Sequence, residues 1–182
     1  MLQQILASRP LRSAGVVLLL VALGTGAAEA CRRPPEEQLM RPERQLAFAT
    51  DIAVARVVSA LPVGDDTVEY RFVVQKRLAG PATESFTLHG IAPDARFASH
   101  RAEQADHDGL KFWARGGGRV MNDPACVIRP WFTLGEAYLV ILDKPYTWRS
   151  FEHIATVDGR FDARDKWLMY VEGRVGGALQ TE

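Results

Sequence analysis

The sequence of 182 residues contains only two cysteines, Cys31 and Cys126, and no excess of charge of either sign. Its 22 lysine and arginine residues equal its 22 aspartate and glutamate residues in number. A balanced chain provides no large field for attracting nucleic acid or anionic lipid, so neither is predicted as a partner. The apolar run Val16–Leu23 is far shorter than the roughly 20 residues that a membrane-spanning helix needs, so no membrane span is predicted either.

Catalytic signatures are also lacking. The sequence has no Gly-x-Ser-x-Gly motif, no His-Glu-x-x-His motif and no glycine-rich phosphate loop between a strand and a helix. The carboxylate pairs Glu36-Glu37 and Asp65-Asp66 fall in polar segments, where exposed carboxylates are ordinary. We therefore predict a protein that is not an enzyme, with no catalytic residues and no bound cofactor.

Residues 1–30 have the pattern of a signal peptide. Arg9 and Arg12 precede the apolar run Val16–Leu23, and the small residues that follow end in Ala28-Glu29-Ala30, which matches the A-x-A cleavage pattern. We therefore expect an exported protein, periplasmic or secreted, whose mature chain begins at the next residue. A short membrane anchor is the alternative interpretation of the same run.

A cysteine at the first mature position also fits a bacterial lipoprotein, in which Cys31 would carry lipid. Glu29 argues against that interpretation, because the lipoprotein pattern requires small residues before the cysteine. If the protein is exported and not lipidated, its two cysteines most simply form one disulfide. A bond between Cys31 and Cys126 would close a loop of about 100 residues. In the chain-entropy model, this would add up to about 4.7 kcal/mol to the free energy of unfolding. The other possibility is a lipidated Cys31 with Cys126 as a buried free thiol.

The mature chain, residues 31–182, is long enough for one domain with its own core. Alternating or continuous apolar patterns predict five strands. They cover residues 51–61, 67–78, 85–89, 138–142 and 150–157. The strand at 138–142 is apolar on both faces and therefore belongs in the middle of the β-structure. The order of these strands suggests a small Greek-key barrel.

Two helical segments flank the predicted strands. Residues 36–49 read as a short helical segment interrupted near Pro42. Residues 162–172 read as a C-terminal helix, with Asp162 as its N-cap and Gly173 as its stop. The chain between 91 and 125 is different, because it is long and rich in glycine, aspartate, histidine and arginine, and only residues 100–113 of it could be helical. We predict that this long loop is variable and faces a partner.

Three segments resemble the bacterial netrin-like domains, relatives of the tissue inhibitors of metalloproteinases. They are Cys31 with Phe48–Val57, then Tyr70–Val74 with Arg77–Pro81, and Cys126 with Leu134–Val140. The resemblance covers roughly residues 31–143. It implies a barrel of the oligonucleotide/oligosaccharide-binding (OB) type to which a disulfide fastens the N-terminus.

The same resemblance implies a possible role for Cys31. In the animal inhibitors, the α-amino group and carbonyl of the first cysteine coordinate the zinc ion of the target protease, filling its open position. Cys31 matches that cysteine if cleavage follows Ala30. The sequence departs from the family in two places, because Arg33 stands where the second cysteine of Cys-x-Cys would be and Arg32 occupies the specificity position.

A weak metal-binding pattern lies in the long loop. His100, Asp106, His107 and Asp108 are the nearest thing in the sequence to a ligand cluster, but a solvated acidic loop is the favoured interpretation of these residues. On a helix, the two histidines would lie two turns apart, about 10.5 Å along the axis, which is too far for one ion without a bend. The sequence thus favours a non-enzymatic binding module whose partner is another protein. The alternatives are a metalloprotease inhibitor that acts through Cys31 and a lipid-anchored envelope protein.

Overall fold

A computed structural model describes residue 31 and residues 34–92, 106–116, 120–123 and 125–178. Five strands form the main antiparallel sheet in the order β3-β2-β1-β6-β7. They are β1 (Ile52–Pro62), β2 (Val68–Ala79), β3 (Ser85–Gly90), β6 (Ala137–Ile141) and β7 (Phe151–Ile154). Two small ribbons accompany the sheet: β4 (Val120–Asn122) with β5 (Ile128–Pro130), and β8 (Thr156–Val157) with β9 (Arg160–Phe161). The prediction of a mainly β domain is confirmed.

The Greek-key connection is also present. Strands β1, β2 and β3 follow one another as antiparallel neighbours, and β6 returns to pair with the free side of β1. The sheet does not close into a barrel in the described residues, where β3 and β7 are its two edges. The end of β3 nevertheless lies against β5, where the amide of Ile91 donates to the carbonyl of Pro130 at 2.9 Å.

Alternate residues of β6 face two different cores, which is why this strand is apolar on both faces. Tyr138 and Val140 belong to an aromatic core, in which the ring of Phe132 packs edge-to-face on Tyr70, Phe72, Tyr138 and Phe151 at centroid distances of 4.9 to 5.7 Å. Leu139 and Ile141 belong to a second core, which the helices cover. All five residues of β6 are buried, as predicted.

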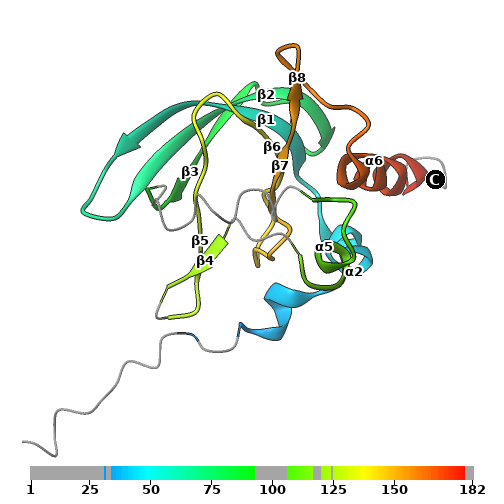
Figure 1. The fold of residues 1–182 in the computed structure, drawn as a ribbon, viewed down its shortest axis with the longest axis horizontal. Coiled ribbons are helices and arrows are strands. Elements are labelled where there is room, and N and C mark those ends of the chain that lie inside the picture. Colours follow the sequence, from blue (N-terminus) through cyan, green and yellow to red (C-terminus); the bar gives the residue numbers. More distant parts are fainter. Residues whose placement is uncertain (1–30, 32–33, 93–105, 117–119, 124, 179–182) are drawn as a thin grey trace, which may run out of the picture.

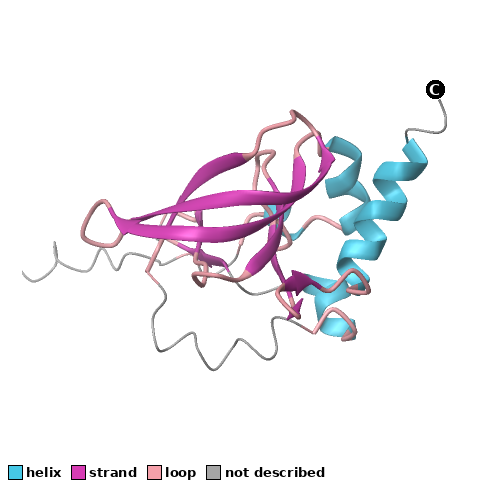
Figure 2. Cartoon of the chain, turned by 90° about the horizontal axis from the view of Figure 1, so that it is seen from above, coloured by secondary structure: helices cyan, strands magenta, loops and turns pink. Residues whose placement is uncertain are grey.

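Four helices complete the described fold: η1 (Glu36–Leu39), α2 (Pro42–Phe48), α5 (Leu110–Arg115) and α6 (Lys166–Ala178). Helices α2, α5 and α6 gather at one end of the molecule, and the turn between β1 and β2 projects at the opposite end (Figures 1 and 2). The predicted interruption near Pro42 is confirmed, since Pro42 opens α2 at its first turn. None of the helices in the described residues is long and apolar enough to span a membrane.

The expected boundaries of the C-terminal helix were wrong at both ends. Asp165, not Asp162, caps α6, because its Oδ1 accepts the amide of Leu168 at 3.0 Å. Asp162 instead accepts the amide of Arg164 at 2.9 Å in the turn before the helix. The helix continues past Gly173 because a glycine ends a helix when its backbone turns to positive φ, and Gly173 does not do so.

The long loop predicted at 91–125 contains regular structure. Helix α5 and strand β4 both fall within it, and Phe112 of α5 is buried in the helix-covered core. This part of the segment is therefore structural, which corrects the expectation that the whole loop faces a partner. Residues 93–105, 117–119 and 124 lie outside the described residues.

The close approach of β3 to β5 depends on Gly90. A Cβ atom at this position would lie 2.0 Å from the carbonyl oxygen of Pro130, so Gly90→Ala must push the two segments apart. We expect Gly90→Ala to lower the free energy of unfolding by about 1–3 kcal/mol, as overpacking does elsewhere. Gly173→Ala is the matched control, because no atom lies within 4 Å of its added Cβ and alanine favours helix, so this variant should unfold no earlier than the wild type. Thermal unfolding of both variants measures the difference, and equal midpoints would contradict the role assigned to Gly90.

Candidate functional site

A disulfide joins Cys31 to Cys126 across 95 positions of sequence, with Cα atoms 5.1 Å apart. The predicted pairing is confirmed, and a sulfur held in this bond cannot also carry a lipid thioether. The side-chain amides of Gln38 and Asn122, one buried and one half-buried, form hydrogen bonds around this disulfide. Gln38 donates to the carbonyl of Cys126 at 2.6 Å, and Asn122 donates to the side-chain oxygen of Gln38 at 2.8 Å while lying 3.5 Å from the Cys31 sulfur.

A groove of about 620 Å³ opens beside this bond. We call it the disulfide groove, and it is lined by Pro35, Glu37, Gln38, Thr67, His89 and residues 125–129 and 144–146. The turn that carries Val127 is rigid, because Asp123 Oδ1 accepts the amides of Ala125 and Val127 at 2.9 Å each. Val127 is nonetheless 55% exposed, so the groove presents an apolar side chain on a fixed support.

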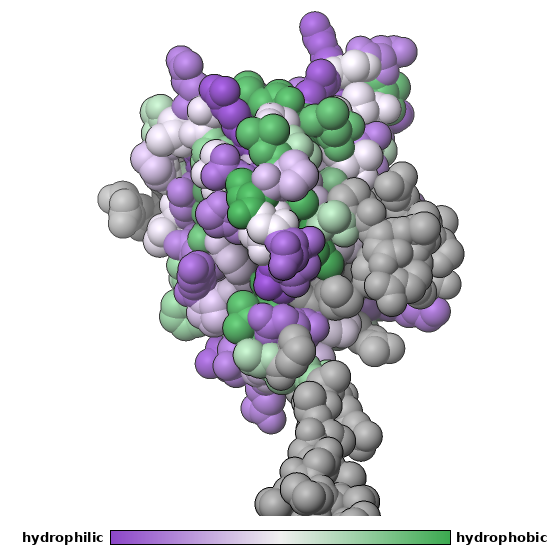
Figure 3. Space-filling view, turned by 90° about the vertical axis from the view of Figure 1, so that its left-hand side faces the viewer, coloured by the Kyte–Doolittle hydropathy of each residue, from purple (hydrophilic) through white to green (hydrophobic). Residues whose placement is uncertain are grey.

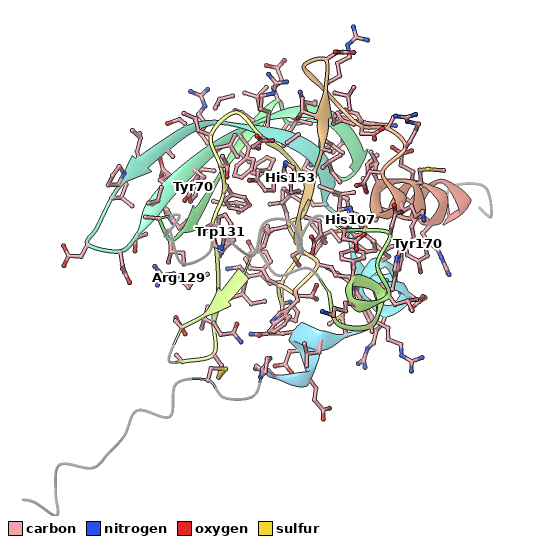
Figure 4. The ribbon with its side chains drawn as sticks, viewed as in Figure 1. Tyr70, His107, Arg129, Trp131, His153 and Tyr170 are labelled. Atoms are coloured by element: carbon pink, nitrogen blue, oxygen red, sulfur yellow. A yellow bond between two sulfur atoms is a disulfide. The ribbon has the colours of Figure 1, made fainter. Side chains whose placement is uncertain are left out.

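The charged groups of the disulfide groove lie at its rim. Arg129 donates to the hydroxyl of Thr67 at 3.1 Å and lies 3.8 Å from the exposed carboxylate of Asp66. Figure 4 places Arg129 at the end of the molecule opposite to Tyr170 of α6. The ammonium of Lys144 lies 5.7 Å from the centre of the Tyr146 ring. The groove therefore combines an apolar lining with cations that remain close to solvent.

A second groove of about 340 Å³ adjoins the first. It lies between α2 and the end of β6, is lined by Phe48 and Ile141 among others, and shares Lys144 and Pro145 with the disulfide groove. We call it the Phe48 groove, since the ring of Phe48 is 68% exposed there. The two grooves thus meet at the Lys144-Pro145 corner.

The structure separates the residues of the predicted metal pattern. His107 is buried, whereas Asp106 and Asp108 are exposed, and His100 lies outside the described residues. Asp108 pairs with Lys166 at 2.7 Å. In the part of the chain that the structure describes, no three His, Cys, Asp or Glu side chains are grouped so that they could hold a metal ion.

His107 instead lies between two carboxylates that the sequence analysis did not associate with it. Its Nδ1 is 2.6 Å from Asp165 Oδ2, and its Nε2 is 3.4 Å from Glu152 Oε2. Figure 4 shows His107 between the sheet and the helices. Burial alone would lower the pKa of His107, but the hydrogen bonds to Asp165 and Glu152 outweigh it and raise the pKa to about 9. His107 is therefore protonated at neutral pH and acts as the cation of a buried ion cluster.

Arg149 is the second buried cation near this cluster. Its side chain is 1% exposed and donates to the carbonyls of Phe112 at 2.9 Å and Trp113 at 2.7 Å, at the end of α5. These bonds and those of His107 join the α5 segment to β7 and α6. The role of the cluster is structural, because its groups are buried and directed at one another.

No sequence signal could have found this cluster. His107 is 45 residues from Glu152 and 58 from Asp165, and only the folded chain brings them together. Neither a comparison with models of known protein families nor a search of curated proteins finds a match for this chain. The netrin-like resemblance therefore stays a prediction.

The raised pKa of His107 makes stability depend on pH. Its contribution is fully present below the unfolded-state pKa of about 6.5 and is lost as pH rises through about 9, a difference of about 3 kcal/mol. We expect the urea midpoint of the wild type to fall between pH 6 and pH 10. In His107→Gln the midpoint should already be low at pH 6, because Asp165 and Glu152 lose their cation, and this component of the pH dependence should disappear.

Lys166→Gln is the matched control for this measurement. It removes the ion pair with Asp108, whose two side chains are 61% and 71% exposed, so its effect should stay below about 1 kcal/mol. A His107→Gln variant that keeps the wild-type slope between pH 6 and pH 10 would contradict the assignment.

Proposed function

We propose that this protein is an exported, non-enzymatic binding module with a netrin-like fold, and that it binds another protein through the disulfide groove. The observation that carries the proposal is the groove itself. Its volume is in the range of known ligand sites, and its apolar side chain Val127 is held exposed by a turn that Asp123 makes rigid.

The chemistry of the groove supports binding rather than reaction. Its rim groups are already engaged with neighbours: Arg129 with Thr67 and Asp66, and His89 with Glu69 at 3.4 Å. Both of these pairs lie near solvent, where a charge keeps most of its hydration. An apolar surface with a charged rim is the usual anatomy of a protein interface.

Export is supported by the sequence of residues 1–30 and agrees with the disulfide. Oxidising compartments favour such bonds, whereas the cytosol keeps most thiols reduced. The Greek-key order of β6, β1, β2 and β3, together with the fastening of Cys31 to the domain, agrees with a netrin-like fold.

Site-specific photo-crosslinking tests the proposed surface. A photoreactive phenylalanine analogue in place of Val127 should crosslink a discrete protein partner in the native extracytoplasmic compartment, and the purified partner should then bind the unmodified protein. The matched control places the same analogue at Met169 of α6, which is equally exposed at 55% but lies at the helical end. Crosslinking from Met169 alone, or from neither position, would refute the groove as the binding surface.

A second candidate function, inhibition of a zinc metalloprotease through Cys31, is favoured by the disulfide that holds Cys31 to the β4–β5 ribbon. A cysteine amine and carbonyl can fill the open position of a catalytic zinc, and fixing the chain end lowers the ordering cost of doing so. Arg32 would restrict the targets to proteases with an acidic or open pocket, since burying an unpaired charge is costly.

An added alanine before Cys31 tests this second function. The extension moves the α-amine away from the cysteine carbonyl, so any inhibition of a panel of zinc proteases should be lost while the unfolding temperature stays unchanged. The unextended mature chain is the control. Inhibition that survives the extension would show that zinc chelation by Cys31 is not the mechanism.

A further inference from the structure

The disulfide groove and the Phe48 groove share one boundary, the Lys144-Pro145 corner between β6 and β7. They also share a wall, because the segment that contains η1 and α2 contributes Gln38 to the first groove and Met40, Gln45 and Phe48 to the second. A ligand that followed this segment would therefore pass from one groove into the other around Pro145.

Each groove presents one strongly exposed apolar side chain. Val127 is 55% exposed in the disulfide groove and Phe48 is 68% exposed in the Phe48 groove. The face shown in Figure 3, at the end with the β1–β2 turn, has hydrophobic residues scattered among hydrophilic ones. The two grooves differ from such scattered residues because they are concave and joined, so one occupant can cover both apolar side chains.

Lys144 is the exposed cation at the shared corner. The neighbouring carboxylate, Asp143, is directed away from Lys144 into the backbone: it accepts the amides of Thr50 and Asp51 at 2.8 and 2.9 Å and the hydroxyl of Thr50 at 2.7 Å. Lys144 is exposed, and within the described residues its nearest recorded partner is the ring of Tyr146. Arg129 of the disulfide groove is already engaged with Thr67 and Asp66, and each groove is also lined by one acidic side chain, Glu37 in the disulfide groove and Asp143 in the Phe48 groove.

We propose that the two grooves form one site for an extended, acidic segment of a partner protein, with an apolar side chain in each groove and a carboxylate on Lys144. The proposal rests on the proposed function, because it names the part of the partner that the disulfide groove receives. Two apolar depressions on either side of a cation suit a polypeptide, in which apolar and acidic side chains alternate along an extended backbone. An acidic polysaccharide would match the cations but would leave Phe48 and Val127 without a partner.

A random peptide library displayed on phage and selected against the full mature protein tests this inference. The selected peptides should be enriched in aspartate or glutamate flanked by apolar residues. A synthetic peptide of the consensus should lose about tenfold in affinity for Lys144→Ala, measured by fluorescence anisotropy. Phe48→Ser and Val127→Ser should each weaken the same peptide by a similar factor.

Lys111→Ala and Met169→Ser are the matched controls, because they remove an exposed cation and an exposed apolar side chain that line neither groove. Both should bind the peptide as the wild type does. Lys144→Glu provides a sharper test, since peptides with lysine in place of the acidic residue should now bind better than the original peptide.

Three outcomes would overturn the inference. Selection of basic or uncharged peptides, displacement of the selected peptide by dextran sulfate with no loss in Phe48→Ser, or concentration-dependent self-association that Lys144→Ala abolishes would each assign the site to a different occupant. These results would leave the groove as a binding surface. The proposed function fails separately, when no partner crosslinks at Val127.

Discussion

The structure depends on the pairing of the first half of β1 with β6, where both strands are buried on both faces. Ile52 lies opposite Ile141, and Val54 lies opposite Leu139, and all four side chains are at most 1% exposed. A strand pair without a solvent face requires a layer of side chains on each side. The aromatic core supplies one layer, and the helices supply the other.

The C-terminal helix makes extensive contacts with the helix-covered core. Trp167 of α6 packs on Phe112 at a centroid distance of 5.4 Å and on Trp113 at 5.9 Å, so the helix and the α5 segment bury one another. The buried ion cluster around His107 lies at the same junction, where Asp165 serves both as the cap of α6 and as a partner of His107. Burying these charges costs desolvation free energy. A different packing that separated them would cost more, because it would leave a buried charge unpaired.

The proposed binding surface lies apart from the His107 cluster. The disulfide and its amide braces hold the N-terminal segment against the β4–β5 ribbon, and the grooves form where this segment meets the β6–β7 turn. The rigidity of these walls reduces the ordering that a partner must impose on them, which favours affinity from a modest apolar area. Neither groove draws residues from the His107 cluster, so substitutions at the proposed binding surface leave that cluster intact.

Local patterns determined the strands, because burial on one or both faces leaves a period of two or a continuous apolar run in the sequence. Val68, Tyr70 and Phe72 alternate with half-buried or exposed residues along β2, and the pattern predicted both the strand and its buried face. The interruption at Pro42 was predictable for a similar reason, since proline restricts its own backbone and that of the residue before it. The pairing of the two cysteines followed from their number and the expected compartment.

Only the tertiary structure decided the features that depend on contacts between distant residues. Asp165 rather than Asp162 caps α6, because several local aspartates can cap a helix and packing of Trp167 selects where the helix begins. Nothing near His107 in the sequence indicates that Glu152 and Asp165 will enclose it, and its spacing from Asp106 and Asp108 suggested a solvated loop instead. The grooves, too, exist only where segments separated by about a hundred residues meet, since a concave surface is a property of packed elements and leaves no periodic trace in any one of them.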